Sequence, residues 1–260
     1  MQPMPQLIPL LKQLRLSGIL DSIESRNRQA INDQLSHLDF LSFLVQDELA
    51  RREQKKYALR YKRASFQGDK TIVNFDLGAV PVSNRQLIQD LMSCRFIEEK
   101  ANALIVGPCG TGKSHIAQAL GNEAVRKGFD VLFIKHTKLL GQLQAAKGTG
   151  TLEKKLSQLT DLDLLIIDDF GLRPMEARQE DLFHELISER YERCATIVTS
   201  NLDYSEWGAA FSNKLLGAAT IDRLRHGAYR LVLDTESYRQ PRGESRSTKQ
   251  LLPDASRTDM

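Results

Sequence analysis

The sequence has few cysteines and no long apolar run. No stretch of about 18 or more apolar residues occurs in its 260 residues, so we expect no membrane span. The first residues lack the basic-then-apolar pattern of a secretory signal. The three cysteines, Cys94, Cys109 and Cys194, are far apart and form no CxxC pair. This argues against a disulfide scaffold or a zinc ribbon and favours a cytoplasmic protein.

Net charge is also small, and it is unevenly distributed. The formal charge is +3 at neutral pH, which alone indicates no particular partner. Residues 1–66 hold 11 Lys and Arg against 7 Asp and Glu, whereas residues 67–239 hold 21 against 23. The excess of positive charge therefore lies in the N-terminal quarter of the chain.

This N-terminal part has a helical pattern. Apolar residues at spacings of three and four predict one helix over 8–26 and a turn near 32–36. A second, longer helix is predicted from 38 onward, because neither Gly nor Pro interrupts the sequence until Gly68. The second helix ends in seven cations: Arg51, Arg52, Lys55, Lys56, Arg60, Lys62 and Arg63. These cations form either a solvated helix face or a contact with the phosphate backbone of double-stranded DNA, and the residues alone leave both interpretations open.

A break near residue 66 predicts two folded parts and a tail. We expect a small helical N-terminal domain over 1–66 and an α/β domain over 67–239. The last residues, 240–260, are polar with Pro, Gly and Ser, and predict a disordered tail.

The most specific motif is GPCGTGKS, which follows an apolar strand at 103–106 and precedes a predicted helix at 115–127. Strand, glycine-rich turn and helix are the context that GxxxxGK[ST] requires. The loop's backbone N–H groups and the helix N-terminus bind phosphates, while its lysine reaches the β- and γ-phosphates. The predicted nucleotide-binding residues are Gly107, Pro108, Cys109, Gly110, Thr111, Gly112, Lys113, Ser114 and His115.

A second buried strand is predicted at 131–134 and a third at 164–167, and two adjacent carboxylates follow the third. Together with a P-loop they form a Walker B pattern, in which Asp168 holds Mg²⁺ through water and Ser114 is its other protein ligand. Asp169 then polarises the attacking water. Glu is more usual at this second position, so we expect hydrolysis to be slow or to depend on a partner.

Three further residues are predicted to complete the site. Asn201, or the adjacent Thr199 or Ser200, follows a strand at 196–201 and would contact the γ-phosphate or the water. Arg223 precedes a last strand at 229–233 and is either a surface ion pair or an arginine finger acting in trans on a neighbouring subunit. Arg239 is a candidate second phosphate-binding cation.

Together these segments resemble the AAA+ ATPases, and within them the IstB-like ATP-binding proteins of insertion sequences, which are related to the helicase loader DnaC. The resemblance rests on GPCGTGKSHIAQALG, LLIIDDFG, TIVTSN and ATIDRLRHGAYRLVL. It implies a five-stranded parallel sheet in a three-layer αβα arrangement with the P-loop strand central. It also implies ATP and Mg²⁺ as ligands, ATP-dependent oligomerisation on double-stranded DNA, and stimulation of a transposase encoded by the same element.

Two other functions use the same core. A DnaC-like replicative helicase loader would use residues 1–66 to grip a helicase and would prefer single-stranded DNA. A small-molecule kinase would need an arginine-rich lid and an acceptor pocket, and the sequence shows no lid between its predicted strands.

Overall fold

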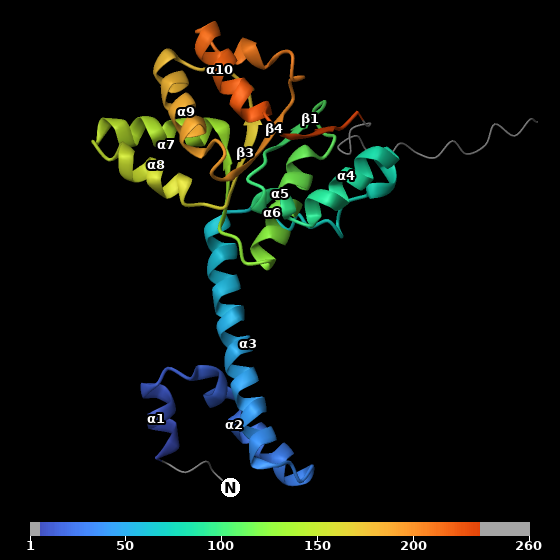
Figure 1. Cartoon of the computed structure of the whole chain (residues 1–260), viewed down its shortest axis with the longest axis vertical. Helices are drawn as coiled ribbons and strands as arrows, with labels where there is room; N and C mark the ends of the chain where they lie inside the picture. Colours follow the sequence, from blue (N-terminus) through green and yellow to red (C-terminus); the bar gives the residue numbers. More distant parts are fainter. Residues whose placement is uncertain (1–5, 235–260) are drawn as a thin grey trace, which may run out of the picture.

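In the computed structural model, residues 6–234 are described. A helical arm leads into an α/β body, and the arm's far end lies well away from the sheet (Figure 1). Arg239 and the predicted tail at 240–260 lie outside the described residues. Among the described helices, none is both long and apolar enough to cross a membrane.

The helical arm consists of three helices: α1 (Leu7–Gln13), α2 (Ser17–Asn32) and α3 (His37–Ala64). The prediction of a single helix over 8–26 is therefore wrong, because α1 and α2 occupy this range. The chain turns at Arg15, which has a φ of 56°, and the N–H of Leu16 closes the turn on the Leu11 carbonyl. The turn directs apolar residues of both short helices toward one small core against α3: Leu11, Ile19, Ile23 and Leu44.

Helix α3 connects this core to the α/β body without interruption. Ser36 caps its start, since its hydroxyl accepts the N–H of Asp39, and the helix ends before Ser65, which adopts a left-handed conformation. Near that end Ala64 is fully buried in the main core, with Tyr61 and Phe66 packed against it. The first part of α3 thus packs on α2, while its last turns pack on the body.

The sheet has five parallel strands in the order β2-β3-β4-β1-β5. They are β1 (Ala103–Val106), β2 (Val131–Lys135), β3 (Leu164–Phe170), β4 (Ala195–Ser200) and β5 (Tyr229–Val232). The predicted five-stranded parallel sheet is confirmed. The P-loop strand is not central, however, because β4 occupies the middle and β1 lies between β4 and β5.

Helices cover both faces of the sheet, which confirms the predicted three layers (Figure 1). Alternate strand residues face opposite cores, as Leu104 and Ile105 do on β1. One face packs against the end of α3, α4 (Val82–Met92), α5 (Arg95–Glu98) and α6 (Lys113–Arg126). The other packs against α7 (His136–Gly148), α8 (Leu152–Thr160), α9 (Ala177–Arg190) and α10 (Lys214–Arg225). Short 3-10 helices lie at Leu77–Ala79 and Trp207–Ala210.

Because all five strands are parallel, their carboxyl ends lie along one edge of the sheet. In open α/β sheets ligands bind at this edge. The P-loop leaves β1 there, and the carboxylates of β3 and the polar end of β4 lie beside it.

Candidate nucleotide-binding site

The P-loop has a backbone that side chains would prevent. At Gly107, a Cβ atom would lie 2.1 Å from the carbonyl oxygen of Leu233. Gly112 has a φ of 90°, and a Cβ there would meet the ring of Phe75 at 2.6 Å. Helix α6 begins directly after the loop, at Lys113. The Lys113 ammonium donates a 2.6 Å hydrogen bond to the Pro108 carbonyl. These contacts hold a glycine-rich loop against the N-terminus of α6, and a glycine-rich loop followed by a helix N-terminus is an arrangement that binds phosphate.

The two carboxylates of β3 lie in a bulge. Pairing between β3 and β4 shifts register between Ile167 and Phe170, and Asp169 has a left-handed φ of 60°. Asp168 is 3% exposed and accepts a 2.6 Å hydrogen bond from the hydroxyl of Thr199 on β4. The same hydroxyl accepts the N–H of Asp169 at 3.1 Å. Thr199 thus fixes both carboxylate-bearing residues, and bulges of this kind often re-aim side chains at active sites.

A cavity of about 410 Å³ lies over the P-loop. Its lining includes eight of the predicted site residues: Cys109, Gly110, Gly112, Lys113, Ser114, His115, Asp169 and Asn201. Four other predicted residues are not part of this lining: Gly107, Pro108, Thr111 and Asp168. Thr111 is fully buried and its hydroxyl donates to the Pro108 carbonyl, so it braces the loop from behind.

Residues that carry no motif also line the cavity. They are Lys70, Lys135 and Leu172. Lys135 ends β2, and its ammonium lies 3.2 Å from a carboxylate oxygen of Asp169. Its position at the carboxyl end of a parallel strand is a signal that sequence analysis could have used. Lys70 precedes the P-loop by more than thirty residues, and no pattern in the sequence marks it.

Some of the polar side chains predicted to bind the nucleotide are bonded within the chain instead. The His115 ring nitrogen Nε2 lies 2.8 Å from the Thr71 carbonyl, and the ring packs against Phe75. Of the three candidates at the end of β4, only Asn201 lines the cavity. Thr199 binds the carboxylates, and the buried Ser200 hydroxyl donates to the Phe170 carbonyl.

The structure does not bring Arg223 to this cavity. It lies half-buried on α10, and its guanidinium donates to the Ala219 carbonyl one turn earlier. Any contact between Arg223 and a nucleotide therefore needs a second subunit. For Arg239 there is no placement, since it lies outside the described residues.

The residues present fit a magnesium ion. The described part of the chain holds no group of three or more His, Cys, Asp and Glu side chains placed to bind a metal. Mg²⁺ does not need such a group, since it commonly binds one or two protein oxygens together with water and substrate phosphates. The hydroxyl of Ser114 and the carboxylate of Asp168 are oxygen donors of this kind.

The seven cations of α3 divide into two groups. Four are held within the chain: Arg51 with Asp21, Arg52 with Glu48, Lys55 with the Ser17 hydroxyl, and Arg60 with Asp130. The other three, Lys56, Lys62 and Arg63, are exposed and have no partner among residues 6–234. These three are available to an external anion without loss of an internal bond.

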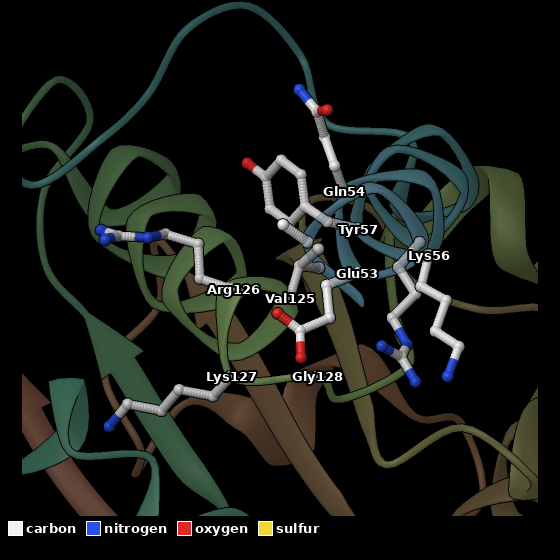
Figure 2. A pocket seen from close by; sticks show the side chains of 10 residues that line it. Glu53, Gln54, Lys56, Tyr57, Val125, Arg126, Lys127 and Gly128 are labelled. Carbon is white, nitrogen blue, oxygen red and sulfur yellow. The ribbon is translucent and has the colours of Figure 1, made fainter. Parts of the chain in front are cut away.

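A groove of about 870 Å³ lies between α3 and α6. Figure 2 shows Tyr57 and Glu53 of α3 between the two helices, while Lys56 and Arg126 point in opposite directions. The carboxylate of Glu53 and the pairing of Arg126 with Glu123 reduce positive charge there. Of the three unpaired cations of α3, Lys56 lines this groove, whereas Lys62 and Arg63 are exposed on α3 outside its lining.

Comparison with known proteins identifies the family. A sequence profile described as "IstB-like ATP binding protein" matches residues 9–246. The chain belongs to this family. It is 36% identical over 236 residues to a protein of Pseudomonas aeruginosa named as a putative ATP-binding protein of insertion sequence IS21. This match covers 91% of this chain and 89% of that protein. It is 34% identical over 245 residues to an insertion-sequence ATP-binding protein of Mycobacterium tuberculosis, which covers 94% and 98%.

Solved structures show that this IstB-like chain has an AAA+ fold. The DnaC helicase loader is similar with a TM-score of 0.57 at 22% identity, over 64% of this chain and 98% of that one. The replication initiator DnaA bound to AMPPCP and single-stranded DNA is similar with a TM-score of 0.56 at 21% identity, over 66% and 52%. At these identities the likeness concerns the fold alone.

Proposed function

We propose that this IstB-like protein hydrolyses ATP and uses ATP to assemble on double-stranded DNA, where it stimulates the transposase of its insertion sequence. The observation that carries the proposal is the cavity at the carboxyl ends of β1, β3 and β4. There a P-loop lysine, the Asp169 carboxylate and an asparagine line one cavity, and Thr199 holds the Asp168 carboxylate of the same strand end. The relatives' names supply the insertion-sequence context.

The motif residues at the cavity have separate parts in the proposed hydrolysis. Lys113 and the loop N–H groups bind the β- and γ-phosphates and offset their charge. The Asp169 carboxylate accepts a proton from the attacking water, and Asn201 donates to the γ-phosphate or orients that water. A magnesium ion, held by Ser114 and Asp168, would supply further positive charge to the phosphates.

DNA binding is proposed for the exposed cations of α3. Lys56, Lys62 and Arg63 are exposed and available, and each cation that neutralises a phosphate releases counterions. Contacts with phosphate position a protein but do not read bases, so we expect little sequence preference. The remaining cations of the stretch, Arg51, Arg52, Lys55 and Arg60, would contribute after breaking internal bonds.

Charge reversal tests this surface. A variant with Lys56, Lys62 and Arg63 changed to Glu should bind duplex DNA more weakly, with a smaller salt dependence, and retain its ATP affinity. A matched control changes three exposed lysines of α7 and α8 to Glu: Lys138, Lys147 and Lys154. Equal DNA affinity of the two variants would show that the cations of α3 form a solvated helix face and do not bind DNA.

A helicase loader remains the second candidate, since the DnaC loader shares the fold. The deciding measurement is DNA retention with ATP at low salt, using duplex and single-stranded DNA in parallel. Retention of duplex DNA supports the transposition role. A preference for single strands, with capture of a replicative helicase, supports the loader.

A further inference from the structure

A lysine outside every recognised motif lines the nucleotide cavity. Lys70 belongs to the linker, residues 66–71, which joins the helical arm to the α/β body. It contributes a third ammonium group to a lining that already holds Lys113 and Lys135. The acidic residue in that lining is Asp169, which is already paired with Lys135.

The linker is fixed against the helix that carries the P-loop. Three polar side chains of α6 bind its backbone. Gln118 accepts the N–H of Gln67 at 2.6 Å, Asn122 donates to the Lys70 carbonyl at 2.9 Å, and Nε2 of His115 lies 2.8 Å from the Thr71 carbonyl. Because α6 begins at Lys113, the Lys70 backbone has a defined position relative to the P-loop.

The Lys70 ammonium differs from its two neighbours in its bonding. Lys113 donates to the Pro108 carbonyl, and Lys135 pairs with Asp169. Lys70 is half-buried, and no hydrogen bond or ion pair to its ammonium exists within residues 6–234. Several cations around one partly enclosed cavity attract an anion of high charge, and a nucleoside triphosphate is such an anion.

We propose that Lys70 binds a phosphate of the nucleotide and thereby couples nucleotide binding to the linker and the helical arm. The proposal rests on the nucleotide-binding function proposed above. It adds a phosphate ligand that comes from outside the P-loop and the strand ends. The linker follows α3 directly, so a nucleotide held by Lys70 stabilises the junction between arm and body.

Nucleotide affinity tests the contact. The Lys70→Gln variant should bind ATP about fivefold to twentyfold more weakly, since a charge-assisted contact is lost. Adenosine affinity should not change, because adenosine has no phosphate. Lys70→Arg should restore most of the ATP affinity, whereas Lys154→Gln on α8 should leave it unchanged. Circular dichroism and thermal unfolding of each variant would show whether the fold is retained.

Amide hydrogen exchange tests the coupling. In the wild type, saturating ATP should slow exchange in residues 66–72 and in the last turn of α3. In Lys70→Gln, ATP raised to the same occupancy should slow exchange in the P-loop but much less in the linker. Equal protection of the linker in both proteins would show that the coupling does not pass through Lys70.

The outcomes separate this inference from the proposed function. If the wild type and Lys113→Ala both fail to bind ATP specifically, the proposed function itself fails. If the wild type binds ATP and Lys70→Gln binds it equally well, only the role of Lys70 is overturned. An equal loss of adenosine and ATP affinity would also overturn it, because the side chain would then act on the base or on the fold.

Discussion

Asp169 has an uncommon backbone conformation and a specific ion pair. Its φ of 60° is rare for a residue other than Gly, and its carboxylate lies 3.2 Å from the ammonium of Lys135. The surrounding bonds, including that from its N–H to Thr199, hold the residue in place. Strained residues of this kind occur at functional sites, and the carboxylate lines the nucleotide cavity.

Replacing this carboxylate should separate binding from turnover. We expect Asp169→Asn to retain ATP affinity within about twofold, because the P-loop is intact, and to lose about 100-fold or more of the ATPase rate, as expected for a lost general base. Nucleotide titration and steady-state phosphate release measure the two effects. The control is Asp161→Asn, an exposed carboxylate after α8. ATPase rates equal to the wild type would exclude a catalytic role for Asp169.

Cys109 offers a probe of the P-loop itself. It is exposed and lines the cavity, whereas Cys94 is buried and burial raises the pKa of its thiol to about 11. Cys194 is half-buried and its thiol donates to the Thr160 carbonyl. Iodoacetamide should therefore modify Cys109 first, and ATP at about ten times its Kd should slow this reaction about tenfold by occupying the site.

Mass spectrometry of alkylated peptides would measure this protection. Lys113→Ala should abolish the effect of ATP, and Cys109→Ser should leave only the slow reaction of the other thiols. Modification of Cys109 at the same rate with and without ATP would contradict placement of the nucleotide against the loop.

Motif residues could be predicted from the sequence because their spacing and flanking strands are specific. Lys113, Asp168 and Asp169 are of this kind. Lys135 could have been predicted from its place at the carboxyl end of a strand. Lys70 could not be predicted, since its role depends on which chain segments meet at the sheet edge. Arg223 could be proposed only for an oligomer, and in the single chain it lies away from the cavity.

At the level of elements, the helical arm depends on ionic contacts as well as on its small core. Arg26 on α2 makes two hydrogen bonds to the Asp47 carboxylate on α3, at 2.7 and 2.8 Å. These bonds lower the pKa of Asp47 to about 2, from an ordinary value of 3.8. Because the folded-state pKa is the lower one, the stabilisation is present above about pH 4 and is lost as the pH falls toward 2.

Asp47→Asn should therefore weaken the arm in a pH-dependent way. At neutral pH we expect a loss of about 1 kcal/mol in the free energy of unfolding, a value reduced for solvent screening because the pair is partly exposed. Near pH 2 the variant and the wild type should be equally stable. Urea unfolding followed by circular dichroism measures both, with Asp33→Asn at the end of α2 as control. A difference that persists unchanged at acid pH would contradict the ion-pair explanation.

Strands could be predicted more reliably than helices. All five predicted strands are found, because short β-branched and apolar runs ending in polar residues are typical of buried parallel strands. The turn at Arg15 was missed, since no Gly or Pro marks it and a tertiary core determines it. No helix is predicted from the sequence at α4, α5 or α8, which are short, with 11, 4 and 9 residues.

For the whole molecule, the decisive feature is that α3 belongs to both the arm and the body. The sequence predicts a long uninterrupted helix, but it does not show that the last turns pack on α6 and β2. The boundary near residue 66 therefore stays a prediction. A helix that is continuous from the arm core to the sheet connects the proposed DNA-binding cations of α3 to the body that holds the nucleotide cavity.

Assembly is the property that a single chain cannot display, and Arg223 provides its test. If Arg223 of one subunit completes the site of its neighbour, Arg223→Ala and Asp169→Ala should each abolish ATP hydrolysis for different reasons. In a mixture, some interfaces combine an intact carboxylate with an intact arginine. The ATPase rate of an equal mixture should then recover to about a quarter of the wild-type rate if subunits assort randomly and sites act independently. If mixed oligomers form but no ATPase activity is recovered at any mixing ratio, Arg223 does not act on the site of a neighbouring subunit.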